Sequence, residues 1–403
     1  MFASGVTANF DTVGQDGVFT VRVRVTANGV SDVDDATVTV TNVAPTVSGL
    51  ASNSPRDENT ILTVTGLVSD PGWLDPLTAT IDWGDGAGPQ PISGTLENVR
   101  PDATLTFSVD HVYGDDGSFT VTVCGSDDDT TTCAPAFNVV IDNVDPTAVI
   151  DEGETTLVNG IPTIIVHAGE TITFSGRSTD PGSDDLVLSW DWDDGPPAPD
   201  VSTTYLVNDP LTDPDPSPSV QPRDVTDMVD HAFADACIYQ VGFAAADDDD
   251  GTASDSVAVL ITGNEDDGRP SGYWSHQYRR QGSTDFDDAT LTCYLEIVDF
   301  VSDVFHEVRD VSTFPLARSL LFTQGVSVSK RDQLDRDLLT VWLNFANGAV
   351  EWDELVDTNR DGTADTVFHV AMETAEAVRL NPASTNAQFD AQRAILQSIT
   401  DTI

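Results

Sequence analysis

The amino-acid sequence predicts a multidomain protein in which all-β domains are followed by a mainly α-helical C-terminal domain. An acidic, glycine-containing turn leads into a strand at 13–23 and at 111–123, and a diverged copy stands at 231–241. Apolar and polar residues alternate along these strands, whereas helical periodicity takes over after about residue 265. A repeated supersecondary unit without a unique centre is typical of modular binding or spacer proteins.

Two similar linkers mark domain boundaries. The segment 42–45 (Asn-Val-Ala-Pro) recurs at 143–146 (Asn-Val-Asp-Pro), about one immunoglobulin-sized domain later. We expect the last strands of a β-sandwich at 1–44, complete immunoglobulin-like sandwiches at 45–145 and 146–265, and an α-helical domain at 266–403. Because the first unit is short and no secretory signal opens it, we expect the chain to belong to a longer secreted protein.

The strands of the β domains are predicted from strict alternation. Phe119, Val121 and Val123 share one face, and Phe19, Val21, Val23 and Val25 repeat the arrangement near the start. Such runs indicate strands with one face in a core and the other in water. The third domain carries an insertion rich in proline and aspartate from Gly195 to about Asp227, and its run 213–218 is expected to form an extended loop.

Helices are predicted from apolar residues that recur with helical spacing. The face of a first helix is formed by Leu291, Leu295, Val298, Val301 and Phe305. The face of a second is formed by Leu334, Leu338, Trp342 and Phe345, with Ser329 and Asp332 as an approximate capping box ahead of it. Further helical runs extend over Ala377–Leu380 and Phe389–Ile399.

The net charge of −51 limits the partners of the chain. Lys330 is the only lysine, and 56 of the 68 acidic residues are aspartate. Nucleic acids and anionic membranes require clustered basic residues, so both are excluded as partners. No stretch is apolar enough to insert into a bilayer. Two compatible interpretations of the acidity stay open: aspartates that bind calcium, or a surface adapted to high salt.

The four cysteines fall into two pairs. Cys124 and Cys133 stand symmetrically about 128–129, so a hairpin turning there places them opposite each other at a distance that a disulfide spans. Cys237 and Cys293 lack such a local geometry, but a bridge between them would tether the third domain to the helical domain. Disulfides indicate an extracytoplasmic location.

The β domains resemble the polycystic kidney disease (PKD) domain family. The segment 81–86 (Ile-Asp-Trp-Gly-Asp-Gly) matches its tryptophan turn, and 111–123 matches its His-x-Tyr strand and the Gly-x-Phe-x-Val-x-Val that follows. In the third domain, 190–195 departs at one glycine, and Cys237 replaces a later one. The resemblance covers about the first 265 residues. It implies β-sandwiches that space or bind outside the cell, in adhesins, surface-layer proteins and secreted enzymes, and a structural hydrogen bond for His111 and His231.

The helical domain has a fainter resemblance. The segments 272–274 (Gly-Tyr-Trp) and 343–348 (Leu-Asn-Phe-Ala-Asn-Gly) look like a C-terminal module of secreted bacterial proteins. That resemblance implies no reaction.

A calcium loop is the sharpest motif. Oxygen ligands stand at positions 1, 3, 5, 7 and 9 of the calcium-loop register, and they are Asp357, Asn359, Asp361, the carbonyl of Thr363, and Asp365. Gly362 occupies the sharp-turn position, and helical sequence is expected on both sides, as in EF-hand, dockerin and thrombospondin type 3 loops. Phe368 replaces the usual bidentate glutamate, so we expect weak binding, or completion of the site by Glu351 or Glu354.

Other acidic and aromatic residues have alternative interpretations. The runs 127–129 and 247–250 are solvated turns, or they hold calcium near domain junctions together with Asp70, Asp75, Asp180, Asp184 and Asp185. Trp83, Trp190 and Trp192 belong to the core or stack on sugars, and Trp73 is the better candidate for an exposed aromatic. His306 and Glu307 lack a second histidine at zinc-protease spacing.

The sequence therefore predicts a non-catalytic extracellular or cell-surface protein that spaces, adheres or presents a ligand, with calcium as its cofactor. No catalytic motif stands out. The expected partner is an extracellular protein or polysaccharide. The alternative is the accessory, substrate-binding region of a secreted polysaccharide- or protein-degrading enzyme whose catalytic domain lies elsewhere.

Overall fold

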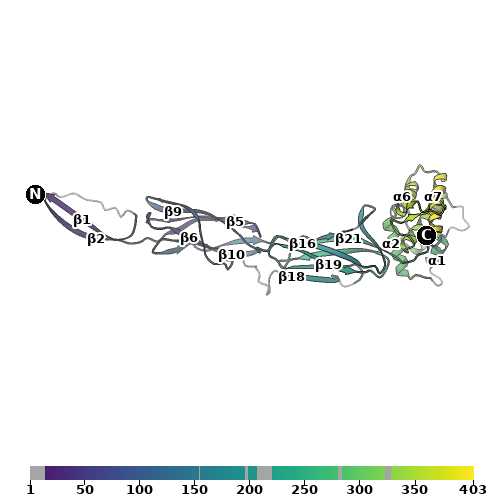
Figure 1. Ribbon diagram of the computed structural model, residues 1–403, viewed down its shortest axis with the longest axis horizontal. Helices are drawn as coiled ribbons and strands as arrows, with labels where there is room; N and C mark the ends of the chain where they lie inside the picture. The colour runs from purple at the N-terminus through teal and green to yellow at the C-terminus, as the bar shows by residue number, and fades with distance from the viewer. Residues whose placement is uncertain (1–13, 154, 196–197, 207–219, 280–283, 323–327) are drawn as a thin grey trace.

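The computed structural model describes residues 14–403 except 154, 196–197, 207–219, 280–283 and 323–327. A β-hairpin (14–44), a first sandwich (45–145), a second sandwich (146–265) and a helical domain (266–403) follow one another in line, and the hairpin and the helical domain lie at opposite ends (Figure 1). The predicted fold class, immunoglobulin-like β-sandwiches followed by a mainly α domain, is confirmed.

The hairpin consists of β1 (Gly17–Ala27) and β2 (Val30–Val40), which pair antiparallel over their whole length. Asn28 and Gly29 form its turn with φ of 50° and 80°. Two consecutive positive φ values are those of the tight turn that matches strand twist. Val23 and Val25, which were expected to face a core, are exposed, because no second sheet among the described residues covers this hairpin.

The first sandwich packs two sheets over one core. One sheet has the order β3-β5-β9-β8, and the other has the order β4-β12-β10-β6-β7 with β11 beside β10. The strands are β3 (Thr46–Ser52), β4 (Arg56–Asp57), β5 (Ile61–Asp70), β6 (Thr78–Asp82), β7 (Gln90–Pro91), β8 (Gly94–Val99), β9 (Asp102–Val112), β10 (Gly117–Ser126), β11 (Thr131–Cys133) and β12 (Phe137–Asp142). Phe119, Val121 and Val123 of β10 are buried, as their alternation predicts.

The second sandwich repeats this plan with the sheets β13-β16-β19 and β14-β15-β21-β20-β17-β18. The strands are β13 (Val149–Asp151), β14 (Thr156–Val158), β15 (Ile161–His167), β16 (Ile172–Asp180), β17 (Leu186–Asp191), β18 (Val201–Tyr205), β19 (Arg223–His231), β20 (Ile238–Ala246) and β21 (Thr252–Thr262). The predicted insertion is shorter than expected, because β18 and the start of β19 lie within it and pair with β17 and β16. The run 213–218 lies outside the described residues.

The two motifs of the family resemblance meet inside each sandwich. His111 stacks on Trp83 with ring centroids 4.6 Å apart, and its Nε2 lies 2.9 Å from Asp85 Oδ2. In the second sandwich, His231 stacks on Trp192 at 4.5 Å, and its Nε2 contacts Asp194 at 2.9 Å. The histidine therefore joins the tryptophan turn to the strand that follows.

Seven helices and a two-stranded ribbon are described in the helical domain. The helices are α1 (Ser271–Gln277), α2 (Asp288–Val301), α3 (Asp303–Glu307), α4 (Phe314–Leu321), α5 (Lys330–Ala346), α6 (Phe368–Leu380) and α7 (Asn386–Thr402), and the strands are β22 (Leu355–Val356) and β23 (Thr366–Val367). The predicted helix through Phe305 is in fact two helices, because the chain is extended at Ser302. No described helix combines the length and the apolar character needed to cross a membrane.

The second sandwich and the helical domain share one hydrophobic core. Val158, Ala236 and Leu260 of the sandwich belong to the same buried cluster as the inner faces of α2 and α5. Backbone hydrogen bonds join Gly263 N to Ala346 O at 2.9 Å and Glu265 N to Asn347 O at 3.1 Å. These two units are therefore fused at what we call the helical junction.

Candidate functional site

The predicted calcium loop connects β22 to β23. Its first carboxylate, on Asp357, accepts hydrogen bonds from the backbone N–H groups of Asn359, Arg360 and Gly362 at 3.0, 2.6 and 2.8 Å. Burial would raise the pKa of Asp357, but these donors outweigh it and the pKa is lowered. Gly362 has φ of 83°, as the sharp turn requires.

The other ligand candidates of the loop bond within it. Asp361 Oδ1 accepts from Thr363 N at 2.8 Å, and Asn359 Nδ2 donates to Asp365 Oδ2 at 2.9 Å. Hydrogen bonds from Thr358 and Thr366 lower the pKa of Asp365. The donor types suit calcium, although the described carboxylates of this loop are not gathered within 4.8 Å of one another.

Among the described residues, the helix expected directly before the loop is absent, and the two nearby glutamates have other contacts. A short strand, β22, precedes the loop, and α5 ends well before it at Ala346, so the arrangement is not helix–loop–helix. Glu354 Oε2 accepts from Glu351 N at 3.0 Å, and Glu351 Oε1 lies 3.8 Å from His167 Nε2. Both glutamates are therefore engaged away from the loop.

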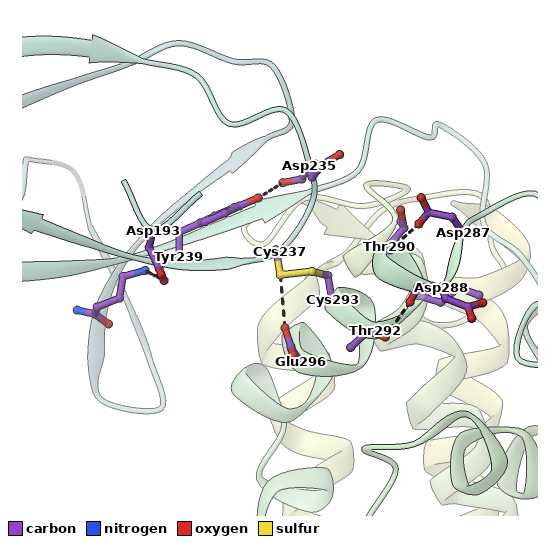
Figure 2. Close-up of a disulfide and its surroundings, with 12 residues drawn as sticks. Asp193, Asp235, Cys237, Tyr239, Asp287, Asp288, Thr290, Thr292, Cys293 and Glu296 are labelled. Atoms are coloured by element: carbon purple, nitrogen blue, oxygen red, sulfur yellow. Dashed lines mark hydrogen bonds between the residues drawn. A yellow bond between two sulfur atoms is a disulfide. The ribbon is translucent and has the colours of Figure 1, made fainter. Parts of the chain in front are cut away.

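Both pairs of cysteines form disulfides. Cys124 and Cys133 are directly opposed in the β10–β11 ladder, with Cα atoms 4.0 Å apart. The second bridge joins Cys237, just ahead of β20, to Cys293 on α2 (Figure 2). Glu296, one turn further along α2, places a carboxylate oxygen 3.4 Å from the Cys237 sulfur. This bridge ties the helical junction covalently.

The tryptophans that might have stacked on sugars are in the cores. Trp83, Trp190 and Trp192 are all buried, which contradicts a role in sugar contact. Trp73 is half-buried against the backbone of the hairpin, because a Cβ added to Gly14 would lie 1.9 Å from its ring. His306 Nδ1 lies 3.2 Å from Asp299 Oδ2, and this pair is exposed.

The acidic turns lie at the junctions between units. Gly14 O accepts a hydrogen bond from Leu74 N at 3.0 Å where the hairpin meets the first sandwich. Gly114 O accepts one from Ser183 N at 2.7 Å where the two sandwiches meet. We call these the hairpin junction and the inter-sandwich junction, and their backbone contacts correspond.

The linkers are anchored to the acidic turns in the same way at both junctions. Asn42 Nδ2 donates to Asp127 Oδ2 at 3.0 Å, and Asn143 Nδ2 donates to Asp247 Oδ2 at 3.0 Å. Both aspartates begin the turn after a long strand of the following sandwich. The repeated linker therefore binds the repeated acidic run through the same asparagine–aspartate hydrogen bond at both junctions.

The inter-sandwich junction gathers carboxylates from both sandwiches. We call this set the inter-sandwich cluster, and its members are Glu58, Asp115, Asp116, Asp180, Asp184, Asp248 and Asp249. Ligand oxygens of three members lie within 4.8 Å of one another in each of three overlapping groups. Asp185 bonds through its backbone N–H to Asp248 Oδ1 at 2.9 Å, so its backbone orients a neighbouring member.

Sequence reasoning singled out Asp180 and Asp184 but missed the contribution of the first sandwich. Asp116-Gly117 at the start of β10 repeats Asp16-Gly17 at the start of β1. That repetition could have indicated that Asp116 lies at a junction. Glu58 stands in a turn with no such repeat, so only the fold places it at the junction.

Comparison with known proteins identifies no family for this chain. No protein-family model matches the sequence, and no curated protein matches it. Among solved structures, the PKD domain of an M14-like peptidase from a Thermoplasmatales archaeon is 15% identical and matches 30% of this chain and 98% of its own, with a TM-score of 0.20. The C-terminal domain of the Streptococcus pyogenes antigen I/II-family protein AspA is 8% identical and matches 55% of this chain and 100% of its own, also at 0.20.

Red sea bream transglutaminase is 12% identical, with 52% of this chain and 31% of that chain covered and a TM-score of 0.20. Scores this low carry no inference about activity.

Proposed function

We propose that this protein is a non-catalytic extracellular spacer whose sandwiches hold the helical domain at one end for a partner. The observation that supports this most is the in-line order of the hairpin, the two sandwiches and the helical domain (Figure 1). An enzyme needs residues brought together around a reacting atom. Here the repeated features are the junctions, which set distance and orientation.

The linkers suit a spacer because they are short and anchored. Pro45 and Pro146, one in each linker, are buried, and proline fixes its own φ. Asn42 and Asn143 tie the same linkers to the turn of the sandwich that follows. A long flexible linker would give no defined reach.

The helical domain is attached more firmly than the other units. A shared core and the Cys237–Cys293 bridge join it to the second sandwich. A module that is meant to be presented benefits from such a fixed attachment, because a partner then loses less orientational freedom on binding. We propose an extracellular protein or polysaccharide as that partner.

Calcium is the proposed ion of the loop 357–365. Asp357, Asn359, Asp361, the Thr363 carbonyl and Asp365 would supply the oxygens. The ion would order the ribbon of β22 and β23 at the start of α6. Its contribution to stability is modest, because a millimolar site in millimolar calcium adds only about 0.5 kcal/mol.

Small-angle scattering of the full chain tests the spacer function. We expect the profile of an elongated particle whose largest dimension far exceeds that of a sphere of the same mass. A compact profile would overturn the proposal. Pull-down with chitin, cellulose and collagen tests the alternative of an accessory region, and failure with all three would count against it.

A further inference from the structure

Three members of the inter-sandwich cluster are buried carboxylates whose charge no donor among the described residues fully compensates. Glu58, Asp180 and Asp184 are only 1%, 2% and 1% exposed. Among the described residues, no hydrogen-bond donor reaches Glu58 Oε2, Asp180 Oδ2 or either carboxylate oxygen of Asp184. Burying a carboxylate is costly unless an opposite charge or a donor compensates it. Bare carboxylates this close need a proton or a cation between them.

The cluster belongs to both sandwiches. Glu58 reaches across the boundary, since a Cβ added to Gly182 of the second sandwich would lie 2.0 Å from Glu58 Oε2. Its other oxygen, Oε1, accepts a hydrogen bond from Val144 N in the linker at 2.8 Å. Glu58 therefore contacts the first sandwich, the linker and the second sandwich, so its contacts depend on the relative position of the two sandwiches.

We propose that the inter-sandwich cluster is a Ca²⁺ site shared by the two sandwiches, with Glu58, Asp180 and Asp184 as its buried ligands and Asp115, Asp116, Asp248 and Asp249 beside them. Oxygen-only donor sets select hard cations, and calcium accepts six to eight oxygens in flexible geometry. Magnesium keeps most of its water and uses one or two carboxylates. A cluster of seven carboxylates therefore fits calcium better.

Arg223 offsets the burial of Asp180 only in part. Burial raises the pKa of Asp180 to about 6, although the backbone N–H of Gly182 and the charge of Arg223 both lower it. The Arg223 guanidinium itself donates to Tyr205 O at 3.1 Å. Burial likewise raises the pKa of Asp184 and of Glu58, and the charge of Asp180 adds to the effect at both.

The hairpin junction also holds buried carboxylates, although no three of its described ligand atoms lie within 4.8 Å of one another. Asp70 and Asp75 are 0% and 3% exposed, and each has one buried oxygen without a donor. Burial raises the pKa of Asp75 to about 6, and the charges of Asp128 and Asp16 add to the effect. Buried carboxylate oxygens without donors therefore occur at two corresponding junctions. This repetition favours one kind of ligand at both junctions over unrelated causes at each.

Among the described residues, no group of three buried carboxylates lies at the helical junction. In the repeat, Asp116-Gly117 corresponds to Ala236-Cys237, so an apolar residue and a disulfide replace the acidic pair. The hairpin junction and the inter-sandwich junction would therefore each be held by a bound cation, whereas the helical junction is held by a disulfide. The calcium site itself does not depend on the proposed spacer function. Only its consequence, that calcium fixes the angle between the two sandwiches, rests on that function.

Calorimetric titration of the full, oxidised chain with CaCl₂ tests the site. The junction variant is Glu58→Gln with Asp184→Asn, and Asp250→Asn is the matched control, an exposed aspartate in the turn that holds Asp248 and Asp249. Asp361→Ala removes the loop site separately. We expect the junction variant to lose one bound ion, with the control unchanged.

Thermal melts keep the test decisive if binding heats are small. In chelator, the junction variant should melt no lower than the wild type, because the substitutions remove repulsion; in calcium it should melt lower. A variant that binds as many ions as the wild type, or that is equally destabilised in both media, would overturn the proposal. The second result would mean that Glu58 and Asp184 share a proton.

Scattering with calcium and with chelator separates the site from the function. If the junction variant loses ion binding but the scattering profile of the wild type is the same with and without calcium, the site is supported and its stiffening role is contradicted. If the wild type binds no calcium but its scattering profile is elongated both in calcium and in chelator, the site is contradicted and the spacer function is supported.

Discussion

At the scale of single residues, the tryptophan turn explains why one departure from the family motif is tolerated. Gly84 has φ of 78°, and a Cβ there would lie 2.5 Å from Thr120 O. Asp193 holds the corresponding place in the second sandwich with φ of 59°. Its carboxylate accepts a hydrogen bond from Gln240 N at 3.1 Å, which compensates the strained backbone.

Substitution of Gly84 by alanine should destabilise the first sandwich by roughly 2–4 kcal/mol, because a strained φ and a backbone clash add. Gly86→Ala is the matched control, since Gly86 has φ of 84° and open space around its Cβ position. We expect about 1 kcal/mol for the control. Denaturant unfolding measures both, and equal losses would show that the clash is relieved.

The buried Glu376 should make the helical domain less stable as pH rises. Its carboxylate accepts from Trp342 Nε1 at 2.8 Å and from Asp303 N at 3.0 Å, and also bonds Ser302. Burial nevertheless raises its pKa to about 7, with the charge of Asp303 adding to the effect. A raised acid pKa gives stability that is present below the unfolded pKa and is lost as pH passes through about 7.

Between pH 5 and 7, Glu376 should therefore lower the free energy of unfolding by at most about 1.4 kcal/mol per pH unit, and the slope should fade above that range. Glu376→Gln should remove this slope. Melts of both proteins across that range, each in the same salt, measure the difference, and parallel curves would contradict the assignment.

At the scale of elements, some helix ends follow from local sequence and others do not. Ser329 caps α5 as its spacing to Asp332 predicts, with Ser329 Oγ accepting from Asp332 N at 3.1 Å. The break between α2 and α3 was not predictable, because Ser302 bonds Glu376, 74 residues later. Apolar spacing alone extends the helix through Phe305, and only the tertiary partner of Ser302 ends it.

Replacement of the cap should weaken α5. Ser329→Ala is expected to cost about 1 kcal/mol, because an N-terminal N–H loses its acceptor. Ser319→Ala is the control, since Ser319 is exposed on α4 and donates to the carbonyl of Leu316 in its own helix. Chemical unfolding followed by the far-ultraviolet signal compares them, and a loss as large in the control would rule out capping.

The candidate sites divide in the same way. The register of the loop from Asp357 to Asp365 is a local pattern, so its ligand candidates could be predicted from sequence. The opposition of Cys124 and Cys133 also follows from a hairpin turn between them. Glu58 could not be placed, because its neighbours Asp180 and Asp184 lie in another domain and no spacing rule connects them.

At the scale of the whole molecule, the net charge of −51 opposes the compact state through self-repulsion. Salt shortens the reach of that repulsion, to about 10 Å at 0.1 M and about 3 Å at 1 M. We expect the melting temperature in chelator to rise between 0.1 and 1 M KCl. Millimolar calcium at constant ionic strength should add a further rise.

The Asp361→Ala and junction variants should lose the calcium increment and keep the KCl increment. If KCl alone accounts for all of the stabilisation, the acidity is an adaptation to salt and the calcium sites should be abandoned. Differential scanning calorimetry resolves the increments by domain.

The bridge between Cys237 and Cys293 also determines how the chain would carry a mechanical load. Tension applied at the two ends passes from the second sandwich through the sulfur atoms directly into α2. The 56-residue separation spanned by the bridge, which includes β20 and β21, is then shielded from extension. Roughly 190 Å of contour length would stay hidden until the bridge is reduced, so a reducing environment would lengthen the stretched molecule without breaking its backbone.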